Sequence, residues 1–426
     1  MLSCNIKQPD MLPRAGEESV TIRIILNSAS LDDMNIPATR LYIGNANSYM
    51  EKNPGVKIEW IFCSDDLYFK TLHNMAASDD LPDIFLLWSH NAHFLPYVNG
   101  GLVHPLPAEE FADYGFFKNA LEQNTAGGKL YALPRTISYR FIIYNQALFD
   151  QYQVKVPATF SELEKAVRVF RKNGIIPMAA STKFSGSYVF CMLPEAIMRI
   201  NKGDASIGRD AAFQKISFSA TPAFREASDY IRRLIDLGLF QDTYTQDDWP
   251  TVEKYLAEGK AAMIYTGGVS LNMGVRESIP REIRENLRCM PFPSMDGTDS
   301  SGTLVRFPSL GWAISSKTKH FEIALDILRE WTKPENFAGP YWKLSLGIPA
   351  QDYSPYITGD ETPLTKSFLD MRNKATAFSG YLFPWVLTPG FEEQSTDSIR
   401  DFYKGKIGSR GLWIRMDRMA AEKQLK

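Results

Sequence analysis

Residues 129–170 limit the possible folds of this 426-residue chain more than any other stretch. Pro134 keeps the residue before it out of the α region, so the chain enters an extended path there. The run Tyr139–Tyr144 is apolar almost throughout, which is typical of a strand buried on both faces. Thr159 and Glu162 then form a capping box ahead of residues with helical apolar spacing. The stretch therefore predicts a buried strand and a following helix, which start beside a proline-set crossing.

Motifs in three separate parts of the chain carry a family resemblance. Residues 131–159 contain Tyr-x-Leu-Pro, Tyr-Asn, Leu-Phe and Val-Pro-x-Thr in that order. Leu81–Phe85 reads Leu-Pro-Asp-Ile-Phe, and Glu258–Gly268 contains Glu-Gly-Lys-Ala-Ala-Met followed by a Gly-Gly pair. In this order and spacing the motifs resemble those of the extracellular solute-binding proteins of ABC importers, in the family that captures sugars and oligosaccharides.

The resemblance implies an α/β fold of two lobes, the type II periplasmic-binding-protein fold, with a hinge and a ligand cleft between the lobes. The chain is also long enough for two or three domains. Prolines that fix an extended backbone mark the expected crossings near Pro134, Pro291–Pro293 and Lys333. The expected parts are a tether at 1–18, an N-terminal lobe at 19–134 and 294–332, and a C-terminal lobe at 135–293 and 333–426.

Aromatic and polar residues at the ends of predicted strands are the candidate ligand contacts. Trp88 closes an apolar run and is followed by Ser89, His90 and Asn91, which predicts a flat ring at the carboxyl end of a strand. Sugar rings pack on such side chains, and amides or carboxylates bind the hydroxyls. A core tryptophan at 88 and a helix-capping acid at 32 are the alternative interpretations. Position and resemblance together give these candidates: Trp88, Asn91, Asp32, Arg135, Ser138, Phe184, Tyr188, Gly267, Gly268, Trp312 and Trp385.

The function that the resemblance implies is capture of a sugar or oligosaccharide and its delivery to the transmembrane subunits of an ABC permease. No bond is broken in that process, and no cofactor or metal is expected. Two alternatives stay open: a glycoside hydrolase, and the same fold with a uronate, a polyol or another non-sugar solute as ligand. Arg135, Arg140 and Arg306 lie near the expected ligand segments and could pair with a carboxylate. A hydrolase needs two carboxylates facing each other across a bond, whereas adjacent acids such as Asp247 and Asp248 point apart.

Charge and cysteine content bound the partners and the location. A net charge of -2 and a pI near 6.3 argue against nucleic acid or an anionic membrane surface as the main partner. The four cysteines form no Cys-x-x-Cys pair, so neither a zinc site nor a disulfide framework is suggested. Met1–Cys4 resembles the end of a lipobox, without the apolar segment that should precede it. The expectation is a monomer outside the cytoplasm, either anchored through a lipid on Cys4 or free in the periplasm.

Overall fold

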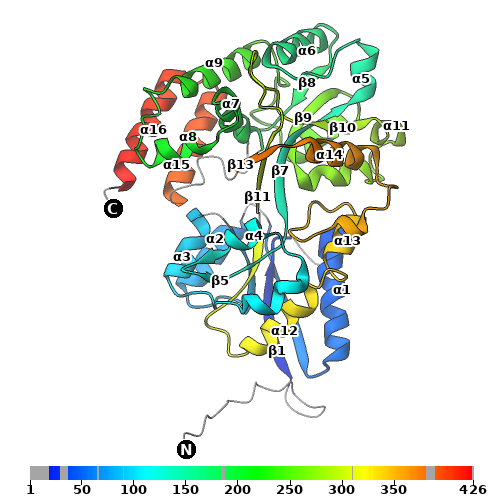
Figure 1. Cartoon of the computed structure of the whole chain (residues 1–426), viewed down its shortest axis with the longest axis vertical. Coiled ribbons are helices and arrows are strands. Elements are labelled where there is room, and N and C mark those ends of the chain that lie inside the picture. Colours follow the sequence, from blue (N-terminus) through cyan, green and yellow to red (C-terminus); the bar gives the residue numbers. More distant parts are fainter. Residues whose placement is uncertain are drawn as a thin grey trace, which may run out of the picture. The chain divides into compact units, whose positions relative to one another are not determined.

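The computed structural model describes residues 19–28, 37–64, 67–89, 91–183, 188–308, 310–379 and 389–424. Contacts within the chain divide it into two compact units (Figure 1). Unit 1 comprises Met1–Ser89, His93–Ile137 and Pro308–Tyr356, and unit 2 comprises His90–Ala92, Ser138–Phe307 and Ile357–Lys426. The main crossings thus follow Ile137, Phe307 and Tyr356, each later in the chain than the point expected from sequence. The tether expected at 1–18 lies outside the described residues.

Unit 1 is built on a sheet whose described strands run in the order β2-β1-β3-β12-β6. β1 is parallel to β2 and β3, and β12 is antiparallel to β3 and β6. Ile22 and Ile24 in β1 and Ile84 in β3 have no exposed surface, and β3 ends at Trp88, which confirms the strand predicted to end there. The strands are β1 (Val20–Leu26), β2 (Val56–Phe62), β3 (Ile84–Trp88), β6 (Leu133–Pro134) and β12 (Leu310–Ile314), with β4 (Thr125–Ala126) and β5 (Lys129–Leu130) as a separate pair.

Helices close the core of unit 1 over this sheet. The ring of Trp331 stacks on Trp60 of β2 with centroids 5.8 Å apart, and Trp312 of β12 meets Trp331 edge-on at 5.7 Å. Large aromatic surfaces are therefore buried where α12 packs on β12 and β2. The helices are α1 (Pro37–Lys52), α2 (Tyr68–Ala77), α3 (Asn91–Asn99), α4 (Lys118–Glu122), α12 (Phe321–Trp331) and α13 (Ala338–Lys343), with short 3-10 helices η2 (Ala108–Tyr114) and η5 (Ser354–Tyr356).

Unit 2 has a second sheet, in which the described strands run in the order β13-β11-β7-β9-β8 and β10 also pairs with β7. β7 is antiparallel to β9, whereas β8 is parallel to β9. Ile142 and Ile143 point to opposite faces of β7 and both have no exposed surface, which confirms the predicted strand buried on both faces. The strands are β7 (Ile137–Asn145), β8 (Ile176–Ala179), β9 (Ala261–Gly267), β10 (Leu287–Met290), β11 (Thr303–Pro308) and β13 (Ala377–Ser379).

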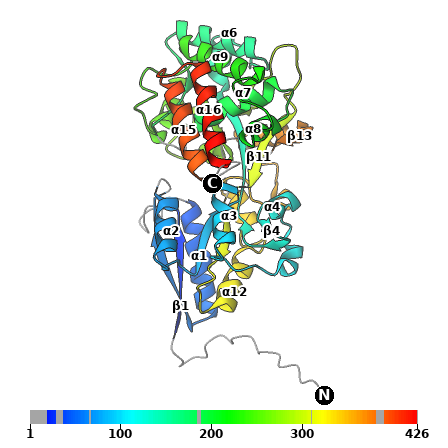
Figure 2. The same ribbon diagram turned by 90° about the vertical axis from the view of Figure 1, so that its left-hand side faces the viewer.

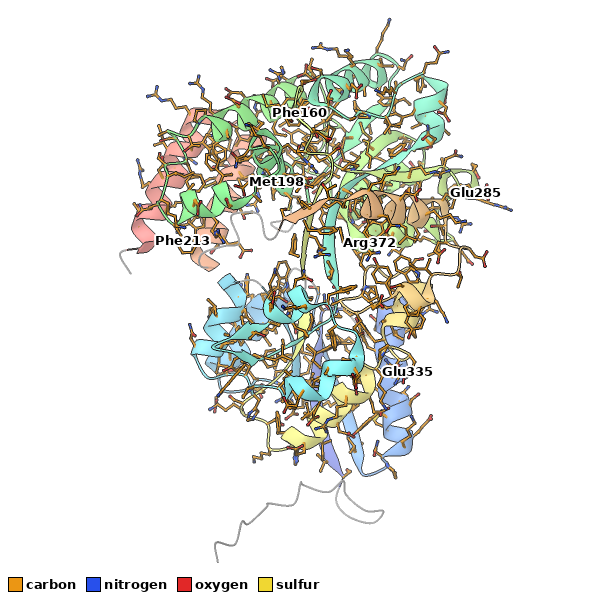
Figure 3. All side chains as sticks on the ribbon, in the orientation of Figure 1. Phe160, Met198, Phe213, Glu285, Glu335 and Arg372 are labelled. Atoms are coloured by element: carbon orange, nitrogen blue, oxygen red, sulfur yellow. The ribbon has the colours of Figure 1, made fainter. Side chains whose placement is uncertain are left out.

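Helices from distant parts of the sequence pack together in unit 2. Phe160 of α6, labelled in Figure 3, stacks on Tyr230 of α9 with ring centroids 3.9 Å apart. The C-terminal α16 contacts α8, α9 and α15, and Figure 2 shows these helices side by side. The elements are α5 (Gln146–Gln151), α6 (Phe160–Lys172), α7 (Met192–Ile200), α8 (Ser206–Ala212), α9 (Pro222–Asp236), α10 (Trp249–Ala257), α11 (Arg281–Arg284), α14 (Pro363–Lys374), α15 (Pro389–Tyr403) and α16 (Ser409–Gln424), with 3-10 helices η3 (Tyr188–Cys191) and η4 (Gly268–Gly274).

Two properties of the described segments bear on the chain's environment. None of their helices combines the length and the apolar character needed to cross a bilayer. Cys63, Cys191 and Cys289 are free thiols, and the last two are buried. Burial raises the pKa of the Cys289 thiol to about 12, so this side chain stays protonated at neutral pH.

Candidate ligand-binding site

In unit 1 the candidate residues gather at the carboxyl ends of the parallel strands β1 and β3. The order β2-β1-β3 places a topological switch point between β1 and β3, because successive connections leave the sheet in different directions. Ligands of open α/β sheets bind at such a point. Asn27 and Ser28 directly follow β1, and Ser89 directly follows β3. This edge of unit 1 therefore carries three hydrogen-bonding side chains where a ligand is expected.

Trp88 is the last residue of β3 and is half-buried. Its ring meets Phe69 edge-on at 5.3 Å and lies 6.0 Å from the ring of His93. Ser89 donates a hydrogen bond of 2.9 Å to Asn124 Oδ1, and Asn124 donates in turn to the carbonyl of Ala120. The neighbouring rings and amide hold Trp88 and Ser89 in defined positions, which favours a pre-formed stacking surface.

Arg135 lies at the same edge of the unit 1 sheet, next to β12. Its backbone N–H donates to the Leu310 carbonyl at 2.8 Å, which fixes the residue beside the start of β12. Its Nη1 lies 3.5 Å from Asn27 Oδ1, and its guanidinium lies 5.8 Å from the centre of the Tyr42 ring. Burial raises the pKa of the Tyr42 phenol, and nearby Arg135 partly opposes that rise, so Tyr42 stays neutral at pH 7. Arg135 thus brings a positive charge to the carboxyl end of β1.

In unit 2 the candidate residues lie at the carboxyl ends of the parallel strands β8 and β9. The antiparallel β7 begins at this same edge, where Arg140 pairs in register with Gly267. Arg140 Nη1 donates to Ser138 Oγ at 2.6 Å and to the Tyr139 carbonyl at 3.2 Å. Ser138 and Arg140 share one face of β7 because residues two apart in a strand point the same way. The predicted Ser138 and Gly267 are therefore brought together, with Arg140 between them.

Gly267 is required by this arrangement. A Cβ atom at this position would lie 2.7 Å from Arg140 Nη1, 2.9 Å from the Tyr139 carbonyl oxygen and 3.3 Å from Tyr188 Cε1. Only glycine leaves the guanidinium room beside the end of β9. Gly268, which follows, is buried at the start of η4.

Tyr188 supplies a half-buried ring to the unit 2 edge. It meets Trp249 of α10 edge-on at 4.9 Å. The Arg140 guanidinium lies 4.9 Å from the ring centres of both Tyr188 and Phe307, so two aromatic side chains contact this cation. Tyr188, a candidate ligand contact from sequence, therefore lies beside Gly267 and Arg140.

The remaining predicted contacts do not add to these groups. Trp312 is 1% exposed and packs in the core of unit 1, so its side chain is not among the proposed contacts. Asn91 is the first residue of α3, and its side chain is not among those that the structure describes. Four further predicted positions lie outside the described residues: Cys4, Asp32, Phe184 and Trp385.

Acidic pairs that a hydrolase would need are used structurally. Asp247 Oδ2 accepts hydrogen bonds from Thr243 at 2.6 Å and from Gln241 at 2.9 Å. Asp248 caps α10 by accepting from the backbone N–H of Thr251 at 3.0 Å. Within the described ranges, no group of three histidine, cysteine or acidic side chains could hold a metal ion. These acids therefore stabilise loops and a helix start.

Unit 2 also contains a pocket of about 220 Å³ away from these strand ends. Its lining includes two arginines and Glu285, which Figure 3 labels, and no aromatic ring. It lacks the flat apolar surface on which a sugar packs. Its lining residues are Gly274, Arg281, Arg284, Glu285, Thr362 and Pro363.

Sequence reasoning did not select Asn27, Tyr42 or Arg140 as ligand contacts, although it named Arg140 as a possible partner for a carboxylate. Tyr42 lies on α1, where an aromatic residue at helical spacing indicates a core position and gives no ligand signal. Arg140 had a usable signal, since it lies two residues after the predicted Ser138 on one face of a strand.

Comparisons with known proteins give the same class throughout. The family model described as bacterial extracellular solute-binding protein matches residues 45–360. The chain is 23% identical to a binding protein of Brucella abortus over 242 residues, 55% of each chain, so it spans about half the length of the curated relatives matched first. It is 21% identical over 328 residues to the multiple sugar-binding protein of Streptococcus mutans, covering 75% of this chain and 72% of that one. Among solved structures, a chitin oligosaccharide binding protein aligns with a TM-score of 0.85 and 19% identity, over 96% of this chain and 100% of that one. These matches confirm the predicted α/β, two-lobed fold class.

Proposed function

The chain belongs to the bacterial extracellular solute-binding proteins, and on that premise we propose that it captures a sugar or oligosaccharide outside the cytoplasm and delivers it to an ABC permease. The observation that carries the proposal is that each unit has a half-buried aromatic ring near the carboxyl end of a parallel strand. One ring ends its strand, and the other lies in the connection that follows its strand. In unit 1 this ring is Trp88, beside Ser89, and in unit 2 it is Tyr188, beside Ser138 and Gly267. Rings for stacking and hydroxyls for hydrogen bonding are what a sugar requires.

Similarity to sugar-binding relatives supports the same ligand class. The Streptococcus mutans relative binds multiple sugars by its name, and the solved neighbour binds a chitin oligosaccharide by its name. We propose that ligand binding draws the two units together about the crossings after Ile137, Phe307 and Tyr356. A ligand shifts such an equilibrium only through its higher affinity for the closed state. The closed, loaded form is the one that we propose docks on the permease.

The proposal is tested by isothermal titration of the purified protein against a panel of oligosaccharides, polyols and other small solutes, with analysis of reducing ends in the same mixtures. We expect saturable binding of at least one compound, a change in tryptophan fluorescence and no new reducing ends. New reducing ends would identify a glycoside hydrolase. Binding confined to uncharged polyols or other non-sugar solutes would keep the fold and reject the sugar.

Closure is tested separately by small-angle X-ray scattering on the full chain. We expect the radius of gyration to fall when the best ligand from the panel saturates the protein, because the units approach each other. An unchanged radius of gyration at saturation would contradict closure while leaving binding intact.

Attachment through Cys4 and the monomeric state belong to the same proposal. Labelling with a radioactive fatty acid in the producing cells should mark the wild-type chain and spare a Cys4→Ser variant. Equal labelling of both would place the lipid on another residue, and labelling of neither would contradict lipid attachment. Sedimentation in solution tests the monomeric state.

A further inference from the structure

Arg140 is a buried cation without a carboxylate partner in its unit. Its side chain is 7% exposed, and its guanidinium interacts with neutral groups: Ser138 Oγ, the Tyr139 carbonyl and the Cys191 thiol. Its Nε donates to no acceptor among the described residues. A buried charge is costly unless it is paired. The parts of unit 2 outside the described residues contain no aspartate or glutamate. Every acidic residue of unit 2 therefore lies within the described part of the chain.

Arg199 in the same unit differs from Arg140 in having a carboxylate partner, although the Nε of both arginines has no acceptor among the described residues. It is fully buried, and its Nη2 donates to Glu195 Oε1 at 2.7 Å. Its Nη1 donates to the Ser300 carbonyl, and Tyr265 donates to the other oxygen of Glu195. Glu195 is thus fully used by Arg199 and Tyr265. Glu195 thus pairs with Arg199 and not with Arg140, so the positive charge of Arg140 is uncompensated among the described residues of unit 2.

The position of Arg140 differs from that of an ordinary core residue. Arg140 lies at the carboxyl edge of β9, against Gly267 and under the half-buried Tyr188. Ser138, also half-buried, hydrogen-bonds to it. These are the same residues that form the proposed sugar contacts of unit 2. A ligand at this edge meets a pre-oriented guanidinium held by two rings and a hydroxyl.

We propose that the ligand is an anionic saccharide, and that Arg140 with Ser138 recognises a single negative group on it, a uronic acid carboxylate or a sulfate ester. The inference rests on the proposed function, because it assigns a substrate class to the same site. One singly charged group balances the one uncompensated cation, whereas a doubly charged phosphate would reverse the imbalance. The neutral hydroxyls of the sugar then hydrogen-bond to the neighbouring polar groups, and its apolar faces pack on the rings.

The test uses matched disaccharides that differ only at C6 of one residue, which carries a hydroxymethyl group, a carboxylate or a sulfate ester. Isothermal titration of the full chain gives a dissociation constant for each. We expect an acidic member to bind about 30-fold more tightly than its neutral partner, the lower end of the effect of one buried charge pair. The carboxylate and sulfate members separate the two sources of the anion.

Variants then locate the preference. In Arg140→Gln the ratio of neutral to acidic dissociation constants should fall to about one, and in Ser138→Ala it should fall several-fold, since the guanidinium loses an aligning partner. Arg171→Gln is the matched control, because Arg171 pairs with Asp242 on an exposed surface, and it should keep the ratio. Should Arg140→Gln fail to fold by circular dichroism, the neutral variant Arg140→Met and Ser138→Ala decide the question by the same ratio.

Three results would overturn the inference. Neutral members that bind as tightly as the acidic ones would reject the anionic ligand and leave sugar capture standing. A ratio that survives in the Arg140 variants would place the recognition elsewhere. Absence of binding by every member, and by the wider oligosaccharide panel, would reject the proposed function and the inference together.

Discussion

Trp88 is the side chain on which proposed sugar binding in unit 1 depends most. Its half-buried ring ends β3 and is held by Phe69 and His93. We expect Trp88→Ala to weaken binding of the best panel sugar by about tenfold or more, since a stacking ring and its buried area are lost. Trp60→Phe is the control, because Trp60 stacks on Trp331 within unit 1 and should leave affinity unchanged. Titration calorimetry measures both, and equal affinity of Trp88→Ala and the wild type would contradict the assignment.

The buried pair of Glu195 and Arg199 gives a prediction on stability. Both side chains are fully buried, so removing one partner leaves a charge in the core of unit 2. We expect Arg199→Met to lower the free energy of unfolding by about 3–5 kcal/mol. The double variant Glu195→Gln, Arg199→Met should lose less than the sum of the single losses, because neither charge is stranded. Urea unfolding followed by circular dichroism tests this, and a loss under about 1 kcal/mol in the single variant would refute it.

At the scale of residues, sequence reasoning selected some positions that the structure brings together. Ser138, Tyr188 and Gly267 were selected from position and resemblance together, and all three lie around Arg140. Trp312 was selected through the resemblance, but its 1% exposed side chain faces the core. Whether a tryptophan in a strand points to the core or to an edge depends on partners distant in sequence, here Tyr42 and Trp331.

Among the elements, helix α6 shows how fully a local pattern can specify structure. Thr159 Oγ1 accepts from the Glu162 backbone N–H at 3.3 Å, and Glu162 Oε2 accepts from the Ala158 backbone N–H at 2.8 Å, which confirms the predicted capping box. We expect Thr159→Ala to lower the free energy of unfolding by about 1 kcal/mol. Thr358→Ala, in an exposed loop, is the control and should change it little. Thermal unfolding of the two variants is the measurement, and equal stability would contradict a role for the cap.

The same cap gives a pH dependence. Hydrogen bonds from Lys155 and then from the Ala158 backbone lower the pKa of the Glu162 carboxyl. A lowered pKa in the folded state means that the contribution of Glu162 is fully present above its unfolded pKa of about 4.3 and is lost as the pH falls further. The stability difference between the wild type and Glu162→Gln should therefore shrink below pH 4.

Strands and helices were largely predictable because their apolar periodicity is local. The structure has β7 and α6 where the sequence placed them, with ends within a few residues, and β3 ends at Trp88 as predicted. The short strands β4, β5, β6 and β13 were not predicted, since two or three residues carry no periodicity. Their pairing depends on partners elsewhere in the chain, such as β12 for β6 and β11 for β13.

For the whole molecule, the alternation of the chain between two units follows from contacts that no local pattern encodes. Prolines near 134, 293 and 334 mark an extended backbone, but the units divide after Ile137, Phe307 and Tyr356. β7 explains the first difference, because it begins at Ile137, just before the division. The class of the fold came from motifs whose order is family-specific, and the family match over residues 45–360 agrees with it.

The central claim is that one solute binds at the carboxyl ends of the strands in both units. Hydrogen–deuterium exchange with and without the best panel ligand tests it most directly. When ligand is bound, we predict slower amide exchange in peptides covering Phe85–Ser89, Tyr131–Arg140 and Met263–Gly268. Exchange in α9 should not change. Protection confined to the pocket lined by Arg281, Arg284 and Glu285, or absent from both sets of strand ends, would contradict the claim.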